Sequence, residues 1–189
     1  MRNIVLLLCT ALTLISCGAS RSTLGKHKEH SPAQIYAEDI NRTTMRAWGM
    51  RTGTAAMNLE AYAAAVARAV LAENTSTLIS RTIKDMEGED AVRSIDFESS
   101  AKEVIKGSRV VMSDRYVNKD GTETCYVAVE ISLDDILMNI RHAEAIREAL
   151  SKASGGKVVD VDSDKFAKTM KESFNHIKEE NNFLDPSFL

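Results

Sequence analysis

The fold is decided by residues 109–131, RVVMSDRYVNKDGTETCYVAVEI. Two runs rich in β-branched and aromatic residues, within 104–117 and 122–131, flank the polar tetrapeptide Asn118-Lys119-Asp120-Gly121. Such runs favour strands, and polar residues followed by a glycine, which tolerates positive φ, are typical of a tight turn. The stretch therefore predicts an antiparallel hairpin.

The second strand of this hairpin has two different faces, because successive side chains of a strand point in opposite directions. One face carries Cys125, Val127, Val129 and Ile131, and the other carries Tyr126, Ala128 and Glu130. We expect Cys125 to pack as a small core hydrophobe. The alternative is a reactive thiol, but no nearby histidine or basic residue indicates an activated thiolate.

Before the hairpin, the sequence predicts a short strand and a long helix. Residues 44–51 alternate loosely, and Gly49 would permit a close approach or a bulge. From Ala56 to about Met86, apolar residues recur three or four apart, and Gly88 is expected to end the helix. Seven alanines within 61–72 would let the helix backbone lie close to a sheet. A membrane span is disfavoured, because charged residues bracket and interrupt this stretch: Glu60, Arg68 and Glu73.

After the hairpin, helical patterns dominate. Ser132 and Asp135 form a capping-box pattern. The helix expected after it carries an apolar stripe of Ile136, Ile140, Ala143, Ile146 and Leu150, and Gly155-Gly156 would end it. Residues 158–161 are consistent with a short edge strand. A last helix is predicted from near Ser163, with a stripe of Phe166, Met170, Phe174 and Ile177.

Together these patterns predict an α+β fold, in which a small antiparallel sheet packs against a long alanine-rich helix. The α+β domain is expected over 35–131, and 132–189 is expected to form a helical C-terminal extension. Because the sheet has only two faces, we hypothesise that 163–189, with its apolar tail, contacts a neighbouring subunit or partner. The alternative is that this segment folds back onto its own domain.

The N-terminus has the pattern of a bacterial lipoprotein signal. Arg2 is followed by an uncharged stretch, residues 4–15, which is too short to span a bilayer as a helix. Leu14-Ile15-Ser16-Cys17 then resembles a lipobox, which implies a signal peptide over 1–16, cleavage after Ser16 and lipidation of Cys17. The alternative is a buried N-terminal helix with a chance cysteine.

Lipidation would place the protein at a membrane without a transmembrane helix. Two or more fatty acyl chains, such as palmitate, hold a protein stably. Gly18 follows the cysteine, rather than the aspartate that often retains lipoproteins in an inner membrane, so we expect the periplasmic face of an outer membrane. Residues 17–34 would comprise the lipidated cysteine and a flexible tether.

The charge balance and the cysteine count limit the kinds of partner and of covalent bond that the chain can form. Removal of 1–16 from the 189-residue chain would leave 173 residues, with 23 basic side chains, after loss of Arg2, against 27 acidic ones. This negative balance favours no nucleic-acid partner. Cys125 would be the one free thiol, so no intramolecular disulfide is expected.

Four stretches carry a family resemblance: Trp48-Gly49, residues 61–72, residues 107–113 and residues 118–131. Over about 44–131, the chain resembles the twenty-kilodalton outer-membrane lipoprotein family, which includes a flagellar basal-disk lipoprotein. The resemblance implies a small α+β domain without known catalytic residues, and in some members assembly into rings. Residues from Leu133 onward lie outside it.

Motifs for catalysis are missing. There is no Gly-x-Ser-x-Gly, no His-Glu-x-x-His and no phosphate loop. The four histidines, expected in the tether or at the surface, are His27, His30, His142 and His176. The acidic cluster expected to form a solvated turn is Asp85, Glu87, Glu89 and Asp90, and the alternating acids expected at the start of the last helix are Asp160, Asp162 and Asp164. We predict no catalytic, cofactor or metal site.

The sequence thus favours a non-catalytic envelope lipoprotein that is anchored by Cys17 and acts through association with itself or with envelope or appendage components. The alternative is a periplasmic ligand-binding or enzymatic module with a cleft that the sequence does not reveal.

Overall fold

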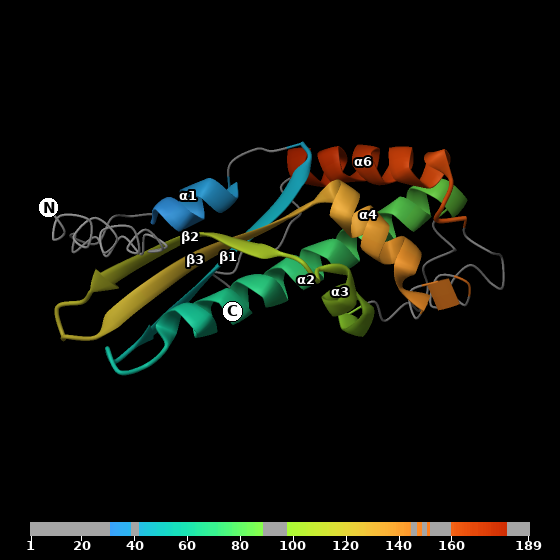
Figure 1. Ribbon diagram of the computed structural model, residues 1–189. Helices are drawn as coiled ribbons and strands as arrows, with labels where there is room; N and C mark the ends of the chain where they lie inside the picture. Colours follow the sequence, from blue (N-terminus) through green and yellow to red (C-terminus); the bar gives the residue numbers. More distant parts are fainter. Residues whose placement is uncertain are drawn as a thin grey trace, which may run out of the picture.

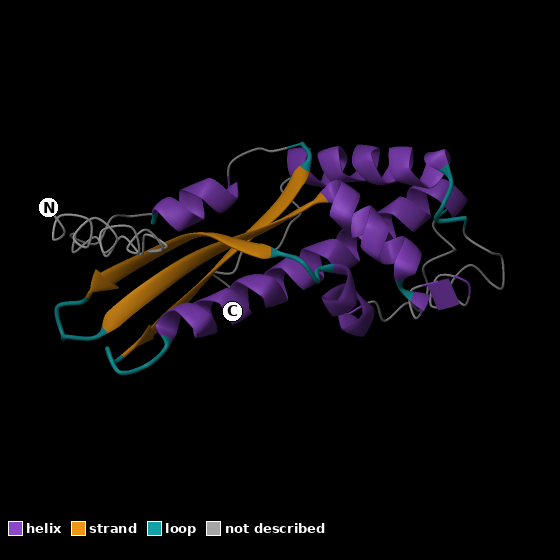
Figure 2. Cartoon of the chain, viewed as in Figure 1, coloured by secondary structure: helices purple, strands orange, loops and turns teal. Residues whose placement is uncertain are grey.

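The computed structural model describes residues 31–38, 42–88, 98–144, 147–148, 151 and 160–180. Its helices and strands are α1 (Pro32–Glu38), β1 (Thr44–Gly53), α2 (Leu59–Glu87), α3 (Glu98–Val104), β2 (Arg109–Val117), β3 (Glu123–Ser132), α4 (Leu133–His142) and α6 (Asp164–Glu179). Figures 1 and 2 show a fold in which the sheet lies toward one end and α4 and α6 lie toward the other. The predicted α+β class is confirmed.

The three strands form an antiparallel sheet in the order β1-β3-β2. The predicted hairpin is confirmed, since β2 and β3 are joined by a turn in which Gly121 has a φ of 83°. Asp120 accepts hydrogen bonds from the backbone N–H and the hydroxyl of Thr122, which fix the turn. We call the end of the sheet with this turn and the β1–α2 turn the hairpin end (Figure 1).

The two faces of the sheet are covered by different helices. α2 packs across one face, and α1 lies on the other, where it contacts all three strands (Figure 1). The predicted alternation of β3 is confirmed: Cys125, Val127, Val129 and Ile131 belong to the main core, on the side of α2. Tyr126 and Ala128 belong to a smaller cluster on the side of α1.

Gly49 sets the distance between β1 and α2. A Cβ atom at this position would lie 2.5 Å from the carbonyl oxygen of Ala63 and 2.5 Å from the backbone nitrogen of Ala67. The glycine and the alanines therefore allow a direct approach of the two backbones, which is the first of the two roles predicted for Gly49.

The ends of α2 follow from local chemistry. The side chain of Asn58 accepts a hydrogen bond from the N–H of Ala61, and Gly88, with a φ of 91°, ends the helix as predicted. The helix begins at Leu59 rather than at Ala56, because residues 55–57 form a turn. Among the described residues, no helix is long and apolar enough to cross a membrane.

The C-terminal helices complete the main core. Ser132 caps α4 by accepting a hydrogen bond from the N–H of Asp135, as predicted. α6 packs against α2, and its predicted stripe is buried throughout: Phe166, Met170, Phe174 and Ile177. The serine at position 173 donates a hydrogen bond to Asp85 of α2, with an oxygen–oxygen distance of 2.7 Å.

This arrangement corrects our hypothesis for 163–189. Within the described part, residues 163–180, the apolar stripe faces α2 of the same chain and not a neighbouring subunit. The reason is the length of α2, since 29 residues span about 43 Å whereas a ten-residue strand spans about 33 Å. The part of α2 beyond the sheet offers the surface that α6 covers. The apolar tail, 181–189, lies outside the described residues.

Four further details differ from the expectations. α1 begins at Pro32, within the segment 17–34 expected to be a tether, and α3 was not predicted. The helix expected after Ser132 is interrupted: α4 ends at His142, because Ala143 adopts an extended backbone, and residues 144, 147, 148 and 151 are helical again. Of the expected edge strand 158–161, residues 160 and 161 form no strand, and Val161 is buried in the core.

Candidate functional site

A cluster of charged and polar side chains lies beneath α1. At its centre is Glu130 of β3, whose side chain is only 9% exposed. Its Oε2 accepts a hydrogen bond from the hydroxyl of Tyr36 at 2.7 Å and one from Nε of Arg46 at 3.3 Å. Its Oε1 accepts from Nη2 of Arg109 at 2.8 Å and from Nε of Arg109 at 3.1 Å. One carboxylate therefore joins α1 to all three strands.

A second carboxylate holds the first turn of α1. Asp114 of β2, which is buried, accepts a hydrogen bond from the backbone N–H of Ala33 at 2.8 Å. We call Tyr36, Arg46, Arg109, Asp114 and Glu130 together the α1 clamp. A seven-residue helix is not stable alone in water, so these contacts and the packing beneath them hold α1 in place.

Local capping also supports α1. The hydroxyl of Ser31 accepts a hydrogen bond from the N–H of Gln34, and the side chain of Gln34 accepts one from the N–H of Ser31. This is a reciprocal capping box. Its signal, a serine three residues before a glutamine and next to a proline, was present in the sequence and was overlooked.

The clamp changes the acidity of its members. Burial raises the pKa of Glu130, but the hydrogen bonds from Tyr36 and Arg109 and the charges of Arg109 and Arg46 outweigh this effect, and the net pKa is lowered. The hydrogen bond to Glu130 and burial raise the pKa of Tyr36. Both shifts favour an ionised carboxylate that accepts a hydrogen bond from a neutral phenol.

An aromatic cluster lies beside the clamp on the same face of the sheet. The ring centroids of Trp48 and Tyr126 are 6.1 Å apart, and those of Tyr116 and Tyr126 are 5.8 Å apart in an edge-to-face arrangement. Ala33 and Ala128 complete the cluster. The face covered by α1 is therefore a second, smaller core.

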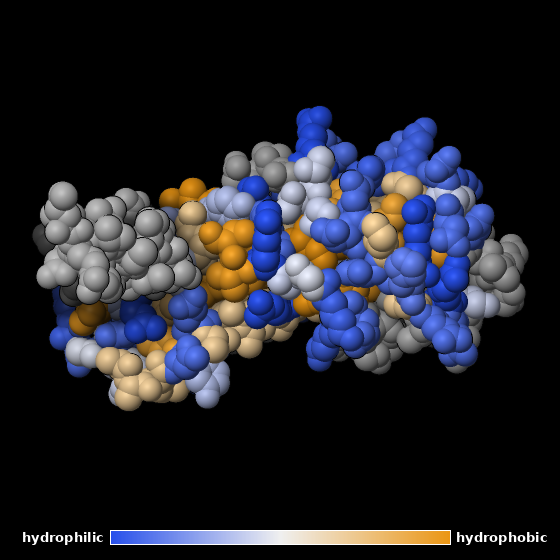
Figure 3. All heavy atoms as spheres, viewed as in Figure 1, coloured by the Kyte–Doolittle hydropathy of each residue, from blue (hydrophilic) through white to orange (hydrophobic). Residues whose placement is uncertain are grey.

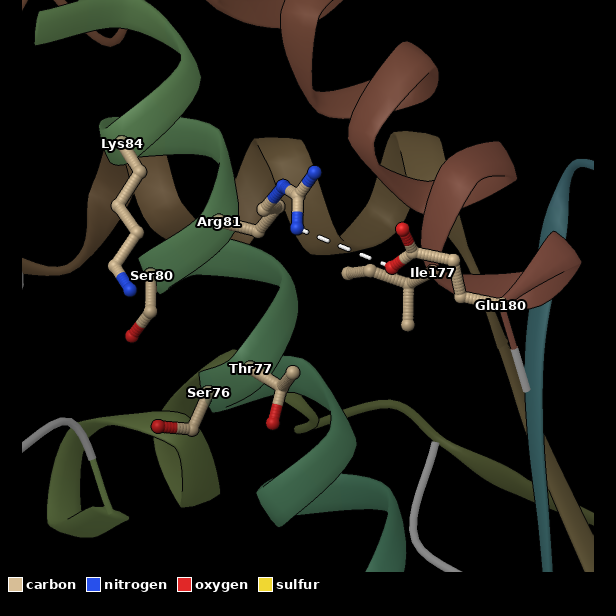
Figure 4. A pocket seen from close by; sticks show the side chains of 7 residues that line it. All are labelled: Ser76, Thr77, Ser80, Arg81, Lys84, Ile177 and Glu180. Carbon is tan, nitrogen blue, oxygen red and sulfur yellow. Dashed lines mark ion pairs between the residues drawn. The ribbon is translucent and has the colours of Figure 1, made fainter. Parts of the chain in front are cut away.

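A polar groove lies between α2 and α6 (Figure 4). Its volume is about 310 Å³, and it is lined by Ser76, Thr77, Ser80, Arg81, Lys84, Ile177 and Glu180. Figure 4 shows Arg81 and Glu180 pointing toward one another, with Nη1 and Oε2 3.9 Å apart. Arg81 also contacts Asp85 at 3.2 Å. Hydroxyls and cations could hold an anion here, but two carboxylates already balance the charge of Arg81.

Cys125 has the environment predicted for a core residue. It is 1% exposed, and burial raises the pKa of its thiol. The hydroxyl of Ser113 lies 3.7 Å from its sulfur. The prediction of a small buried hydrophobe is confirmed, and the geometry is opposite to that of an activated thiolate.

This burial predicts slow chemistry at Cys125. In the native protein, a water-soluble maleimide should modify the thiol at least about 100-fold more slowly than in denaturant, because reaction requires local opening. Mass spectrometry over time measures the rate, and Cys125→Ala gives the background from other sites. Equal rates in the native and the denatured protein would contradict the packed position.

The other residues considered from the sequence lie apart. Cys17, His27, His30, Glu89 and Asp90 are outside the described residues. His142 is in the last turn of α4, and His176 contacts Glu180 with Nδ1 and Oε1 3.1 Å apart. Glu87 is the last residue of α2. Within the part of the chain that the structure describes, no three histidine, cysteine or acidic side chains converge as metal ligands.

The alternating acids lie at the start of α6, where we expected them. Ser163 caps the helix by accepting a hydrogen bond from the N–H of Phe166, and its hydroxyl donates to the carbonyl of Asp160. Asp164 lies in the first turn of the helix. Asp162 pairs with Arg147 and Arg141.

Comparison with known proteins assigns the chain to no family. No protein-family model, curated protein or solved structure matches this chain. The resemblance to the twenty-kilodalton outer-membrane lipoproteins therefore stays a prediction.

Proposed function

We propose that this protein is a bacterial envelope lipoprotein, held at the periplasmic face of an outer membrane by lipids on Cys17. It acts without catalysis, through association with itself or with other envelope or appendage components. The observation that carries the proposal is the lipobox pattern Leu14-Ile15-Ser16-Cys17, which follows a charged start and a short uncharged stretch.

The α1 clamp supports a mechanical role for the N-terminus. α1 begins fifteen residues after Cys17, and hydrogen bonds to the buried carboxylates of Asp114 and Glu130 hold it on the sheet. A force on the lipid anchor would therefore pass into the folded body through Glu130 and Asp114. These buried carboxylates are engaged in holding the fold, which is consistent with a non-catalytic protein.

The groove between α2 and α6 is the observation that favours the alternative, a ligand-binding or enzymatic module. Light scattering on the lipidated protein in detergent distinguishes the two functions. A defined oligomer, or co-purification with another envelope protein, supports the proposal. A monomer whose melting temperature rises with added inorganic phosphate, and no longer rises in Lys84→Ala, supports the alternative.

Lipidation itself gives an all-or-none prediction. Cys17→Ala should abolish incorporation of a clickable fatty acid and leave a larger precursor that retains residues 1–16, because the sulfur that accepts the lipid is gone. Gel migration and label intensity in the producing bacterium measure both effects. Cys125→Ala is the matched control and should keep full label, and undiminished label in Cys17→Ala would refute the anchor.

A further inference from the structure

Exposed apolar side chains gather at the hairpin end of the molecule. We call Met50, Met57, Tyr62 and Val117 the apolar tip, and their exposed fractions are 48%, 37%, 53% and 48%. Figure 3 shows apolar colouring at this end, over the β1–α2 turn and the start of α2.

Separate segments contribute these residues to the same end of the fold: Met50 lies in β1, Val117 in β2, Met57 in the β1–α2 turn and Tyr62 near the start of α2. Gly53 and Val117 both pair with Glu123, so β1 and β2 finish at the same level of the sheet. The sulfur of Met57 lies against Gly53, only 2.7 Å from where a Cβ atom would be. The guanidinium of Arg51 lies over the ring of Tyr62, 5.9 Å from its centroid, so a cation borders the apolar surface.

The start of α1 lies toward this same end. Ala33 binds Asp114, which pairs with Tyr126, whereas Tyr36 binds Glu130, four residues farther along β3 from the hairpin turn. α1 therefore runs away from the hairpin end, and Ser31 lies toward it. In Figure 1, the start of α1 and the two turns lie at one end, and α4 and α6 lie at the other.

From this geometry we propose that the apolar tip rests on the lipid surface to which Cys17 is anchored. The inference depends on the proposed lipidation. Ser31 lies fourteen residues after Cys17 along the chain, which gives a maximum reach of about 50 Å. α2 alone is about 43 Å long, so α4 and α6 lie far beyond the point where the tether meets the domain. Of the two ends of the described fold, the hairpin end is the one toward which the start of α1 lies.

The chemistry of this end suits a bilayer interface. Tyrosine, with an apolar ring and a polar hydroxyl, favours the level of the lipid headgroups, and methionine and valine favour the adjacent apolar layer. Residues 18–30 contain Arg21, Lys26 and Lys28 but only one acidic residue, Glu29. Anionic headgroups attract such a basic segment, which would draw the hairpin end toward the membrane.

Two labelled variants test the contact. In a Cys125→Ala background, Met57→Cys places a fluorophore on the tip, and Met138→Cys places the same fluorophore on α4, where the methionine is also exposed. The lipidated proteins are reconstituted in phosphatidylethanolamine–phosphatidylglycerol vesicles that carry a shallow spin-labelled lipid. We expect quenching at position 57 to be at least about fivefold stronger than at position 138, since an interfacial surface enters the headgroup boundary by about 5–10 Å.

The outcomes separate this inference from the proposed function. Protein that carries no fatty acid label and does not stay with the vesicles refutes lipidation, and the inference fails with it. Lipidated, vesicle-bound protein with equal quenching at both positions overturns the tip contact alone. Protection of position 57 from both the lipid quencher and aqueous iodide shows that a second copy or another protein covers the tip, which also overturns it.

Discussion

Replacing Gly49 with alanine should lower the free energy of unfolding by about 3 kcal/mol or more. The new Cβ atom would lie 2.5 Å from two backbone atoms of α2, a separation that only a shift of the helix relative to β1 can relieve. Such a shift would disturb the main core on both sides of the contact, because interiors are close-packed. Urea unfolding followed by circular dichroism measures the loss.

Gly107→Ala is the matched control for this substitution. Gly107 has a φ of 94°, and a Cβ atom there would meet nothing within 4 Å. Its replacement therefore costs only the strain of a left-handed backbone, about 1–2 kcal/mol. A smaller loss in Gly49→Ala than in Gly107→Ala would contradict the close packing of α2 on β1.

Removing the central carboxylate of the α1 clamp, that of Glu130, should have an effect of similar size. Glu130→Ala breaks the ion pair with Arg46, whose side chain is 10% exposed, and breaking a buried pair costs about 3–5 kcal/mol. Trp48, the only tryptophan, lies in the cluster beneath α1, so its fluorescence should shift to longer wavelength as α1 detaches. Glu123→Gln is the control, because its partner Arg115 is 36% exposed and such pairs contribute little.

The clamp also sets a pH range for the attachment of α1. The pKa of Glu130 is lowered in the folded protein, so its stabilisation is complete above the ordinary value of 4.5 and is lost as pH falls through the folded pKa. The pKa of Tyr36 is raised, so its contribution is complete below 10.0 and is lost as pH rises through the folded pKa. In Glu130→Gln the Trp48 signal should be shifted at neutral pH already and should change less with acid. An unchanged acid transition would contradict the assignment.

The features that the sequence predicts correctly are fixed by residues that lie close together in the chain. The turn at Gly121 lies between two clear strand patterns, so the hairpin follows from adjacent residues. The starts of α4 and α6 follow from serine caps at 132 and 163, each within three residues of its partner. The alternation of β3 followed from the period of a strand.

The features that the sequence does not predict depend on contacts between residues far apart in the chain. Glu130 binds Tyr36, 94 residues away, and Arg46, 84 residues away, so the clamp follows only from the pairing of β1 with β3. α1 is too short to show a periodic pattern and exists because the sheet holds it. The stripe of α6 was identified correctly, but its partner was not, because the sequence does not reveal that α2 extends beyond the sheet.

The strand order has a consequence for how the chain acquires its structure during synthesis. α1 and β1 are made first, but β3, the strand that both require, is made about 70 residues after β1 ends. The hairpin can close rapidly by itself, whereas pairs so distant in sequence form slowly. Trp48 and the other side chains beneath α1 therefore cannot pack until β3 has been synthesised. Of the described helices, α1 is therefore the first to be synthesised and the last to reach its packed position.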